Sequence, residues 1–211
     1  MTDWYKIKRV LTWVNWEEKQ IYPAGLPSTY QEVEYIQSSG TQYIDTWVSW
    51  SWLWSYEIKF NPLSSRATTF EQYIAWATSN YTPKIYYDNS RGTIVINYDP
   101  NVIITIFGLW DSIHTVSISN SWIYVDWTFK QSYSESAWGN LSYYVFNSHW
   151  EPSLFASMKL YSLKMYTWWT PVRDFVPCYR KSDNVIWLYD LVNKQFYTNS
   201  WSWTFTKWPN V

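Results

Sequence analysis

The chain has little glycine, cysteine or histidine, and no excess of either charge. Its 211 residues include 5 glycines, 1 cysteine and 2 histidines. The single cysteine, Cys178, excludes an internal disulfide, and so few soft ligands exclude a clustered transition-metal site. The 16 basic and 17 acidic residues are interspersed and leave a formal net charge of −1, so no basic stripe is available to neutralise a nucleic-acid backbone. We expect no nucleic-acid partner.

Long apolar runs are also missing. The longest, residues 102–110, is much shorter than the roughly 20 residues with which a helix spans a bilayer. Residues 1–10 carry several charges and no continuous apolar segment, so no secretory signal peptide is visible. We expect no membrane span. A place on a virion or an extracellular surface would be reached by another route, such as release of an assembled virus by lysis.

Tryptophan is as frequent as glycine is rare. The chain contains 19 tryptophans, whereas a glycine frequency of ~7% would give a chain of this length about 15 glycines. Two of the tryptophans, Trp16 and Trp127, follow an asparagine and an aspartate between strand-like runs, where Asn-Gly or Asp-Gly would form a hairpin turn. The second residue of such a turn needs a positive φ, which penalises an indole side chain. Others interrupt loop-like sequence in which glycine is common: Trp168, Trp169, Trp201 and Trp203.

We interpret the surplus of tryptophan and the deficit of glycine as one anomaly. The hypothesis is that the gene comes from a lineage, or from a virus of that lineage, that decodes UGA as glycine, and that it was translated with a code in which UGA is tryptophan. Random drift towards tryptophan would not select turn positions. The consequence for function is direct, because many of the rings that suggest a sugar-binding protein would then be absent from the native chain.

The remaining pattern predicts an all-β fold. Helical periodicity is hard to find, whereas short runs of β-branched and aromatic residues recur about every 8–12 residues, a spacing typical of a sandwich. Residues 5–14 and 19–22 predict a hairpin, and three strands joined by tight turns are predicted within residues 114–131. We therefore divide the chain into an N-terminal hairpin extension with its linker, residues 1–25, and a β-sandwich domain, residues 26–211.

Two segments of the chain carry a family resemblance. The run LPSTYQEVEYIQSSGTQYIDT at residues 26–46 resembles the opening of a laminin-G-like, concanavalin A-like jelly-roll family found in bacteriophage and bacterial surface proteins. The run VRDFVPCYRKSDNVIWLYDLVN at residues 172–193, followed by FYTNSWSWTF at residues 196–205, resembles the closing signature of the same family. The resemblance implies a two-sheet antiparallel jelly-roll sandwich, which the family often uses for carbohydrate or protein adhesion and only sometimes with calcium.

The same resemblance bears on the tryptophans. In the family that the two segments resemble, glycine is typical at the positions of Trp47, Trp187, Trp201, Trp203 and Trp208. This agreement supports the coding hypothesis by a route that does not depend on turn chemistry. It does not identify a ligand, because a shared fold does not imply a shared function.

Two pairs of neighbouring tyrosines are the best candidates for a ligand-binding surface that is independent of tryptophan. A planar ring offers apolar area to a pyranose face, while polar groups beside it fix the orientation. One ring of each pair must face outward, because neighbouring strand residues point to opposite sides of a sheet. The alternative is that these outward tyrosines simply cover the sheet. The candidates are Tyr86, Tyr87, Asp88, Asn89 and Arg91 in one group, and Tyr143, Tyr144 and Asn147 in the other.

Patterns that would indicate catalysis are weak. Glu32 and Glu34 share one predicted strand face, about 6.6 Å apart along the strand, but Ile36 stands where the jelly-roll glucanases that they resemble have a third acid. We favour a solvated strand face. His114 and His149 lack the partner pattern of nucleophilic catalysis, and His114 is expected to be a hydrogen-bonded structural group. A glycoside hydrolase would be reconsidered if two carboxylates converged in one concave cleft.

No cofactor is expected, and calcium is the one that the sequence leaves open. Calcium takes about six to eight oxygen ligands, which loop aspartates and backbone carbonyls could supply. The aspartates near predicted strand ends have no ordered ligand spacing, and turn formation is the commoner role of aspartate. They are Asp45, Asp88, Asp99, Asp111 and Asp126.

These observations together predict a non-enzymatic adhesion module of a phage virion or a cell surface, which binds a glycan or a surface receptor. The alternative is a purely structural virion protein for assembly or decoration. Its partner would be another virion protein or another copy of this chain, contacted through residues 1–25, because an extended hairpin can add a strand to a neighbouring sheet. A glycoside hydrolase is the least favoured of the three functions.

Overall fold

The computed structural model covers the chain and describes residues 11–14, 17–20, 25–49, 53, 55–63, 71–76, 84–88, 92–99, 102–107, 111–119, 121–132, 142–147, 155–200 and 204–210. In this described part every regular element is a β-strand. It contains no helix that is long and apolar enough to cross a membrane. The strands form antiparallel sheets in a sandwich, so the predicted all-β fold is confirmed.

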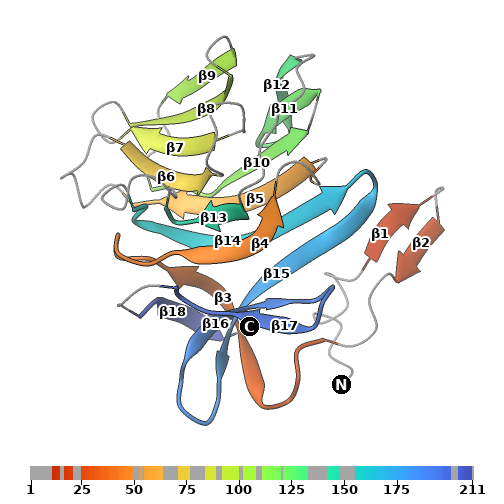
Figure 1. Ribbon diagram of the computed structural model, residues 1–211, viewed down its shortest axis with the longest axis vertical. Coiled ribbons are helices and arrows are strands. Elements are labelled where there is room, and N and C mark those ends of the chain that lie inside the picture. Colours follow the sequence, from red (N-terminus) through yellow and green to blue (C-terminus); the bar gives the residue numbers. More distant parts are fainter. Residues whose placement is uncertain are drawn as a thin grey trace.

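The larger sheet has ten strands (Figure 1). Nine of them follow one another in the order β12 (Thr128–Ser132), β11 (Trp122–Val125), β10 (His114–Ser119), β5 (Ser55–Pro62), β14 (Met158–Thr167), β3 (Tyr30–Gln37), β15 (Thr170–Arg180), β16 (Ile186–Asp190) and β17 (Gln195–Tyr197). The tenth, β18 (Thr206–Asn210), pairs with β3 outside this row.

The smaller sheet has six strands, in the order β4 (Ile44–Ser49), β13 (Ser142–Val145), β6 (Glu71–Trp76), β7 (Lys84–Asp88), β8 (Thr93–Asp99) and β9 (Val102–Phe107). A two-stranded sheet of β1 (Leu11–Val14) and β2 (Glu17–Gln20) stands by itself. In it Val14 pairs with Glu17, which is the register of the predicted hairpin. Its turn residues, Asn15 and Trp16, lie outside the described part.

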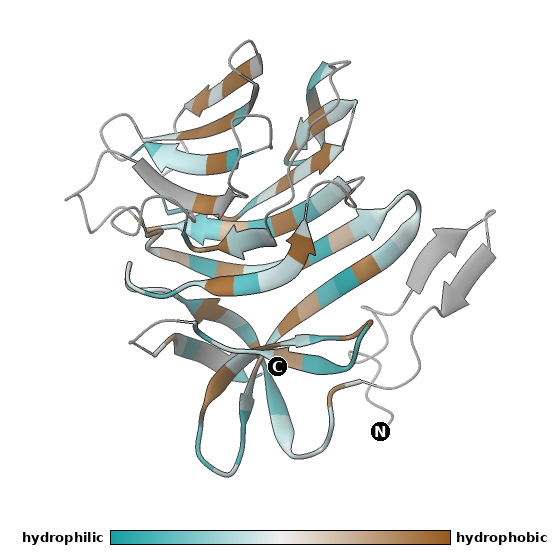
Figure 2. Ribbon diagram, viewed as in Figure 1, coloured by the Kyte–Doolittle hydropathy of each residue, from teal (hydrophilic) through white to brown (hydrophobic). Residues whose placement is uncertain are grey.

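The main core lies between the two larger sheets and follows from alternation along the strands. β5 buries Tyr56 and Phe60 and points Glu57 and Lys59 to the opposite face. Figure 2 shows this alternation as brown and teal bands along the strands. Rings from the two sheets meet in the core, with 5.3 Å between the ring centroids of Tyr56 and Tyr143. β5 therefore presents an apolar face to the core and a polar face to the outside.

The turn predicted at Asp126 and Trp127 has the backbone that the sequence indicates. Val125 pairs with Thr128, which leaves a two-residue loop, and φ is positive at both loop residues, 49° at Asp126 and 63° at Trp127. A type I′ turn has this conformation and prefers Asp-Gly. The Trp127 side chain is 75% exposed, so packing offsets little of the strain of its left-handed backbone.

Two further tryptophans combine a left-handed backbone with an exposed ring. Trp168 is the first residue of the loop between Thr167 and Thr170, with φ of 55°, where a type II′ turn takes glycine. Trp47 also has φ of 55° and lies in β4, at a register shift against β13 that is typical of a glycine-containing bulge. The two rings are 61% and 73% exposed.

Trp187 belongs to a different class. It lies in β16 opposite Cys178, and it is not among the residues with positive φ. Its half-buried ring packs edge-on against Phe196, with 5.5 Å between the ring centroids. With Val176 and Tyr189 these residues form a second apolar cluster, on the face of β15 that points away from the main core. Among the described tryptophans, Trp187 thus occupies a different environment from Trp47, Trp127 and Trp168.

We expect the substitutions Trp127→Gly and Trp168→Gly to stabilise the protein. A left-handed backbone costs a residue with a β-carbon about 1–2 kcal/mol. Each substitution should therefore raise the free energy of unfolding by about 1 kcal/mol, and the melting temperature by roughly 2–4 °C. Thermal and denaturant unfolding measure these two quantities.

Trp187→Gly is the matched control. It should lower the stability, because it removes a packed ring and introduces glycine into a strand. Equal melting temperatures for the parent and the two turn variants would contradict the strain argument.

Candidate ligand-binding site

The larger sheet branches where β14 and β15 separate. Near their common turn the two strands pair with each other, and the last pair of this ladder is Leu163 with Phe175. Beyond that pair β3 enters between them and pairs with β15 on one side and with β14 on the other. The three strands and their divergence can be followed in Figure 1. The outer face of the sheet therefore loses its regular rows of side chains at this point.

A β-bulge in β14 lies beside the branch. Leu160 pairs with Phe60 of β5 and Ser162 pairs with Lys59, so Tyr161 is an extra residue between them. A bulge re-aims the side chain at which it occurs and bends its strand. Branch and bulge together open a hollow of about 360 Å³ on the outer face.

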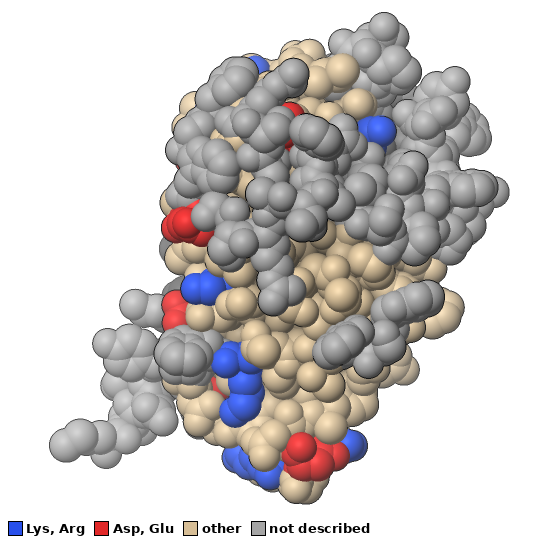
Figure 3. All heavy atoms as spheres, turned by 90° about the vertical axis from the view of Figure 1, so that its left-hand side faces the viewer, with Lys and Arg blue, Asp and Glu red and all other residues tan. Residues whose placement is uncertain are grey.

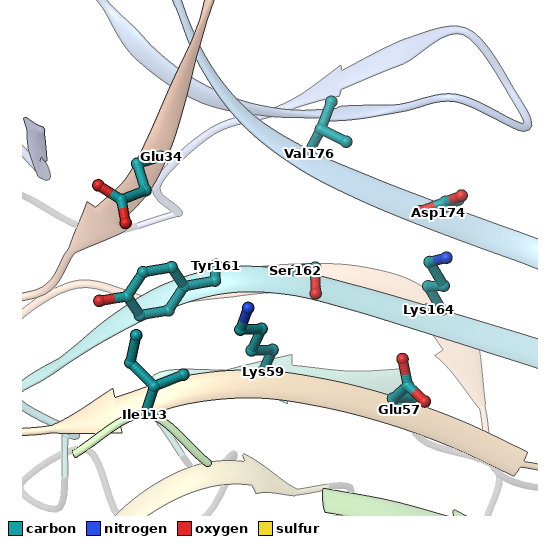
Figure 4. A pocket seen from close by; sticks show the side chains of 9 residues that line it. All are labelled: Glu34, Glu57, Lys59, Ile113, Tyr161, Ser162, Lys164, Asp174 and Val176. Atoms are coloured by element: carbon teal, nitrogen blue, oxygen red, sulfur yellow. The ribbon is translucent and has the colours of Figure 1, made fainter. Parts of the chain in front are cut away.

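Nine side chains line this hollow, and they come from β3, β5, β14, β15 and the segment before β10 (Figure 4). Three of them are carboxylates, two are ammonium groups, two carry hydroxyls and two are apolar. They are Glu34, Glu57, Lys59, Ile113, Tyr161, Ser162, Lys164, Asp174 and Val176.

One end of the hollow carries a row of alternating charge. Lys164 of β14 is directly opposite Glu57 of β5 and Asp174 of β15. In Figure 4 the Lys164 side chain lies between the two acids. With adjacent strands ~4.8 Å apart, the backbones of the two acidic residues are separated by about 10 Å. Glu57 also accepts a hydrogen bond, from the Ser117 hydroxyl at 3.3 Å.

The neighbouring strand β16 holds Asp174 in place. The backbone N–H of Asp174 donates to Oδ1 of Asp190 at 3.0 Å, and the N–H of Leu191 donates to the Asp174 carbonyl at 2.9 Å. Asp190 is fully buried, with one carboxylate oxygen 3.6 Å from Nε of Arg173. Burial raises the pKa of Asp190, and the backbone donors and Arg173 oppose that rise. This wall of the hollow is therefore built on a well-anchored backbone.

Tyr161 lies at the other end. Its ring is tilted against that of Tyr35 at 5.3 Å, and Nζ of Lys59 is 5.7 Å from its centroid. Burial, with a contribution from the Glu34 carboxylate, raises the pKa of Tyr161, so its hydroxyl keeps its proton at neutral pH. Glu34 and Lys59 are exposed, and within the described residues neither forms a hydrogen bond or an ion pair. Both charges are available to a ligand.

Carboxylates do converge in this hollow, which is the condition for reconsidering a glycoside hydrolase. A glycosidase places its two carboxyl groups about 5–10 Å apart on either side of the scissile bond. Here the side chain of Lys164 occupies the space between Glu57 and Asp174, so these two acids do not bracket an open site. Within the described residues, no group of three or more His, Cys, Asp and Glu side chains could hold a metal ion.

The fold, rather than the sequence, has a counterpart among known proteins. No model of a known protein family matches the chain, and no curated protein matches it. The structure is similar to that of a "putative carbohydrate binding protein" from Bacteroides ovatus ATCC 8483, with a TM-score of 0.56 and 10% sequence identity. The match covers 83% of this chain and 60% of the other, so this chain spans less than two thirds of that protein's length. At this identity the similarity shows the sandwich fold alone.

The first predicted tyrosine group lies on the smaller sheet, away from the hollow. In β7, Tyr86 is half-buried on the outer face, whereas Tyr87 points into the core. Asp88 ends the strand and is half-buried. Asn89 and Arg91 lie outside the described residues. Burial, with smaller contributions from two aspartates, raises the pKa of Tyr87 to about 12.

The second predicted group lies on the same sheet but two strands away, because β6 separates β13 from β7. Tyr143 and Asn147 are buried. Tyr144 is half-buried on the outer face and stacks on Tyr43, with 4.9 Å between the ring centroids. Burial and the nearby Asp45 raise the pKa of Tyr144 to about 12. The described residues of the two groups that reach the outer surface are therefore Tyr86, Asp88 and Tyr144.

His114 is a hydrogen-bonded structural group, as predicted. It is buried, with Nδ1 2.8 Å from Asp126 Oδ2 and Nε2 2.7 Å from the Ser112 hydroxyl. The other oxygen of Asp126 accepts the N–H of Thr115 at 2.8 Å. Ser112, His114 and Asp126 are connected in the order of a hydrolase catalytic triad. However, Asp126 also accepts a backbone N–H, and His114 lies on the core side of β10. The set braces the Asp126–Trp127 turn. His149 lies outside the described residues.

The sequence prediction missed most of the hollow. The sequence pattern assigns Glu34 to a solvated strand face and does not single out Glu57, Lys59, Lys164 or Asp174. The available signal was that each of these charged residues alternates with core residues in a predicted strand. That signal places them on an outer face, but it does not say which strands are neighbours.

Proposed function

We propose that this protein is a non-enzymatic adhesion module that binds a glycan, or a receptor bearing one, and that it acts on a phage virion or a cell surface. The observation that carries the proposal is the hollow at the strand branch, with Glu34 and Lys59 on either side of Tyr161 and neither in a hydrogen bond or ion pair among the described residues. The carbohydrate-binding description of the similar structure agrees with it.

The chemistry of the lining suits a sugar. Every sugar hydroxyl both donates and accepts hydrogen bonds, and the hollow offers acceptors in its carboxylates and donors in its ammonium and hydroxyl groups. Its volume of about 360 Å³ is within the range of small-ligand sites. Charges of both signs are dispersed on the face of the molecule in Figure 3, which agrees with a partner other than nucleic acid.

We expect the purified protein to bind at least one class of immobilised glycan on an array. Titration with the corresponding soluble oligosaccharide should give an affinity that falls about tenfold or more in Glu34→Gln and in Lys59→Met, because a hydrogen bond to a charged group contributes about 1.5–3 kcal/mol. EDTA should not change the affinity, and the oligosaccharide should be recovered intact, since we propose neither a metal cofactor nor hydrolysis.

Lys130→Met is the matched control for Lys59→Met. Lys130 is exposed on β12 and does not line the hollow, so its replacement should leave binding unchanged. Absence of any bound glycan would refute the adhesion function, and shortened oligosaccharide products would favour the hydrolase.

The tyrosine groups of the smaller sheet are a second proposed contact surface. Their half-buried described members on the outer face, Tyr86, Asp88 and Tyr144, offer two partly accessible rings and a carboxylate. A ligand that uses this surface would be weakened by Tyr86→Ala and Tyr144→Ala rather than by Glu34→Gln. The same titration therefore distinguishes the two faces.

A purely structural role in virion assembly is the second candidate function. The observation that favours it is the hairpin of β1 and β2, which forms a separate sheet and pairs with none of the other described strands. Such a hairpin can add to the sheet of a neighbour. Its partner would be another virion protein or a second copy of this chain, contacted through residues 1–25.

Light scattering coupled to size-exclusion chromatography tests self-assembly. If residues 1–25 mediate it, the full chain should form oligomers at micromolar concentration, and the chain without these residues should elute as a monomer. Oligomers of equal size for both would contradict this role of the hairpin.

We also infer that the native protein carries glycine at many tryptophan positions, because the UGA codons of its gene are translated as glycine in its natural source. Trp47, Trp127 and Trp168 support this inference, since each has a left-handed backbone and an exposed ring. The proposed ligand site is argued without it, because none of the described residues that line the hollow is a tryptophan.

Peptide mass spectrometry of the protein from its natural source tests the coding inference. We expect peptides with glycine at positions 16, 47, 127, 168 and 203, and UGA codons at those positions in the gene. Tryptophan in those native peptides, or UGG codons, would refute it. The residue found at position 187 is the most informative single result, because the Trp187 ring is packed in the present chain.

A further inference from the structure

We propose that the hollow selects a neutral, hydroxyl-rich sugar, and that it recognises the hydroxyl groups rather than the apolar face of the ring. This inference rests on the proposed glycan-binding function and names the ligand class of the same site. Its basis is the mixture of charges around Tyr161 and the limited access to that ring.

The mixture of charges disfavours a charged ligand of either sign. An anionic sugar would face three carboxylates, Glu34, Glu57 and Asp174, within one hollow of about 360 Å³. A cationic amino sugar would face the ammonium groups of Lys59 and Lys164. A neutral hydroxyl, in contrast, can donate to a carboxylate and accept from an ammonium group. It therefore satisfies both kinds of lining group without repulsion.

The two charges without an ion-pair partner among the described residues are placed to bind hydroxyls from two sides. Glu34 extends from β3 and Lys59 from β5, and Figure 4 shows them approaching the hollow around Tyr161 from opposite directions. Lys164 is different, because it lies between two acids. The two groups most able to form new charge-assisted hydrogen bonds are thus Glu34 and Lys59.

Tyr161 is not an open stacking platform. Its side chain is only 8% exposed, Tyr35 packs against it at 5.3 Å, and Lys59 lies 5.7 Å from its centroid. A pyranose has little free ring face on which to stack. The polar groups of the hollow must therefore supply most of the specificity. Loss of a single sugar hydroxyl should then lower the binding affinity.

The test is calorimetric titration of the full chain with soluble oligosaccharides of three kinds: neutral hexose, uronic-acid and amino-sugar oligomers. We expect the neutral oligomer to bind tightest. Its affinity should change less than twofold between 50 and 500 mM salt, because ionic screening acts on charged ligands. Deoxy analogues that lack one recognised hydroxyl should bind about tenfold more weakly. Glu34→Gln and Lys59→Met should each abolish this discrimination between the parent sugar and one deoxy analogue.

The outcomes separate this inference from the proposed function. Preferred binding of the uronic-acid or amino-sugar oligomer, with affinity that falls steeply with salt, would overturn the neutral-sugar inference and leave glycan binding intact. Neutral-sugar binding that is insensitive to every deoxy analogue would also overturn it. If none of the three oligomers binds, the neutral-sugar inference fails, whereas the proposed function fails only if the array also shows no bound glycan. Glu34 and Lys59 are exposed, so their substitution should not unfold the protein. A cooperative thermal transition near that of the parent verifies that Glu34→Gln and Lys59→Met are folded.

Discussion

The separation of β14 and β15 is the constraint on which the proposed site depends. Two antiparallel strands that stayed paired along their length would present unbroken rows of side chains, and the outer face would be flat. The ladder stops at Leu163 and Phe175, and β3 takes the vacated edges. The extra residue Tyr161 then turns its side chain into the gap. The hollow is thus a product of sheet topology, and the charged residues around it are those that alternation had already placed on the outer face.

Local features of the fold could be predicted from the sequence because their causes are local. The Asp126–Trp127 turn lies between two short β-branched runs, and its positive φ values follow from the two-residue loop. Alternation of apolar and polar residues predicts the buried faces of β5 and β7 in the same way. These patterns need only a few neighbouring residues.

The hollow could not be predicted, because it depends on register between strands that are far apart in the chain. Glu34, Glu57, Tyr161 and Asp174 come from four strands, and nothing near any of them indicates which strands become neighbours. For the tyrosine candidates, the sequence predicts the local orientation of the rings but not the order of the strands. Local alternation predicts that one ring of each pair faces outward, yet it cannot say that β6 separates the two groups.

The described tryptophans cannot be interpreted as one group, because Trp187 differs in its environment from Trp47, Trp127 and Trp168. At Trp47, Trp127 and Trp168 the backbone is left-handed and the ring is largely exposed, so the side chain adds strain and little packing. At Trp187 the backbone is extended and the ring contacts Phe196. A functional interpretation based on total aromatic content would mix these two classes. The proposed site does not depend on this distinction, since none of the described residues that line the hollow is a tryptophan.

A crystal structure of the full chain with a neutral oligosaccharide, soaked at a concentration well above its measured dissociation constant, tests the central claim most directly. The account predicts a sugar ordered in the branch of β14, β3 and β15, with hydroxyls within hydrogen-bond distance of Glu34 and Lys59. A sugar ordered on the outer face of the smaller sheet, with the hollow occupied only by water, would contradict it.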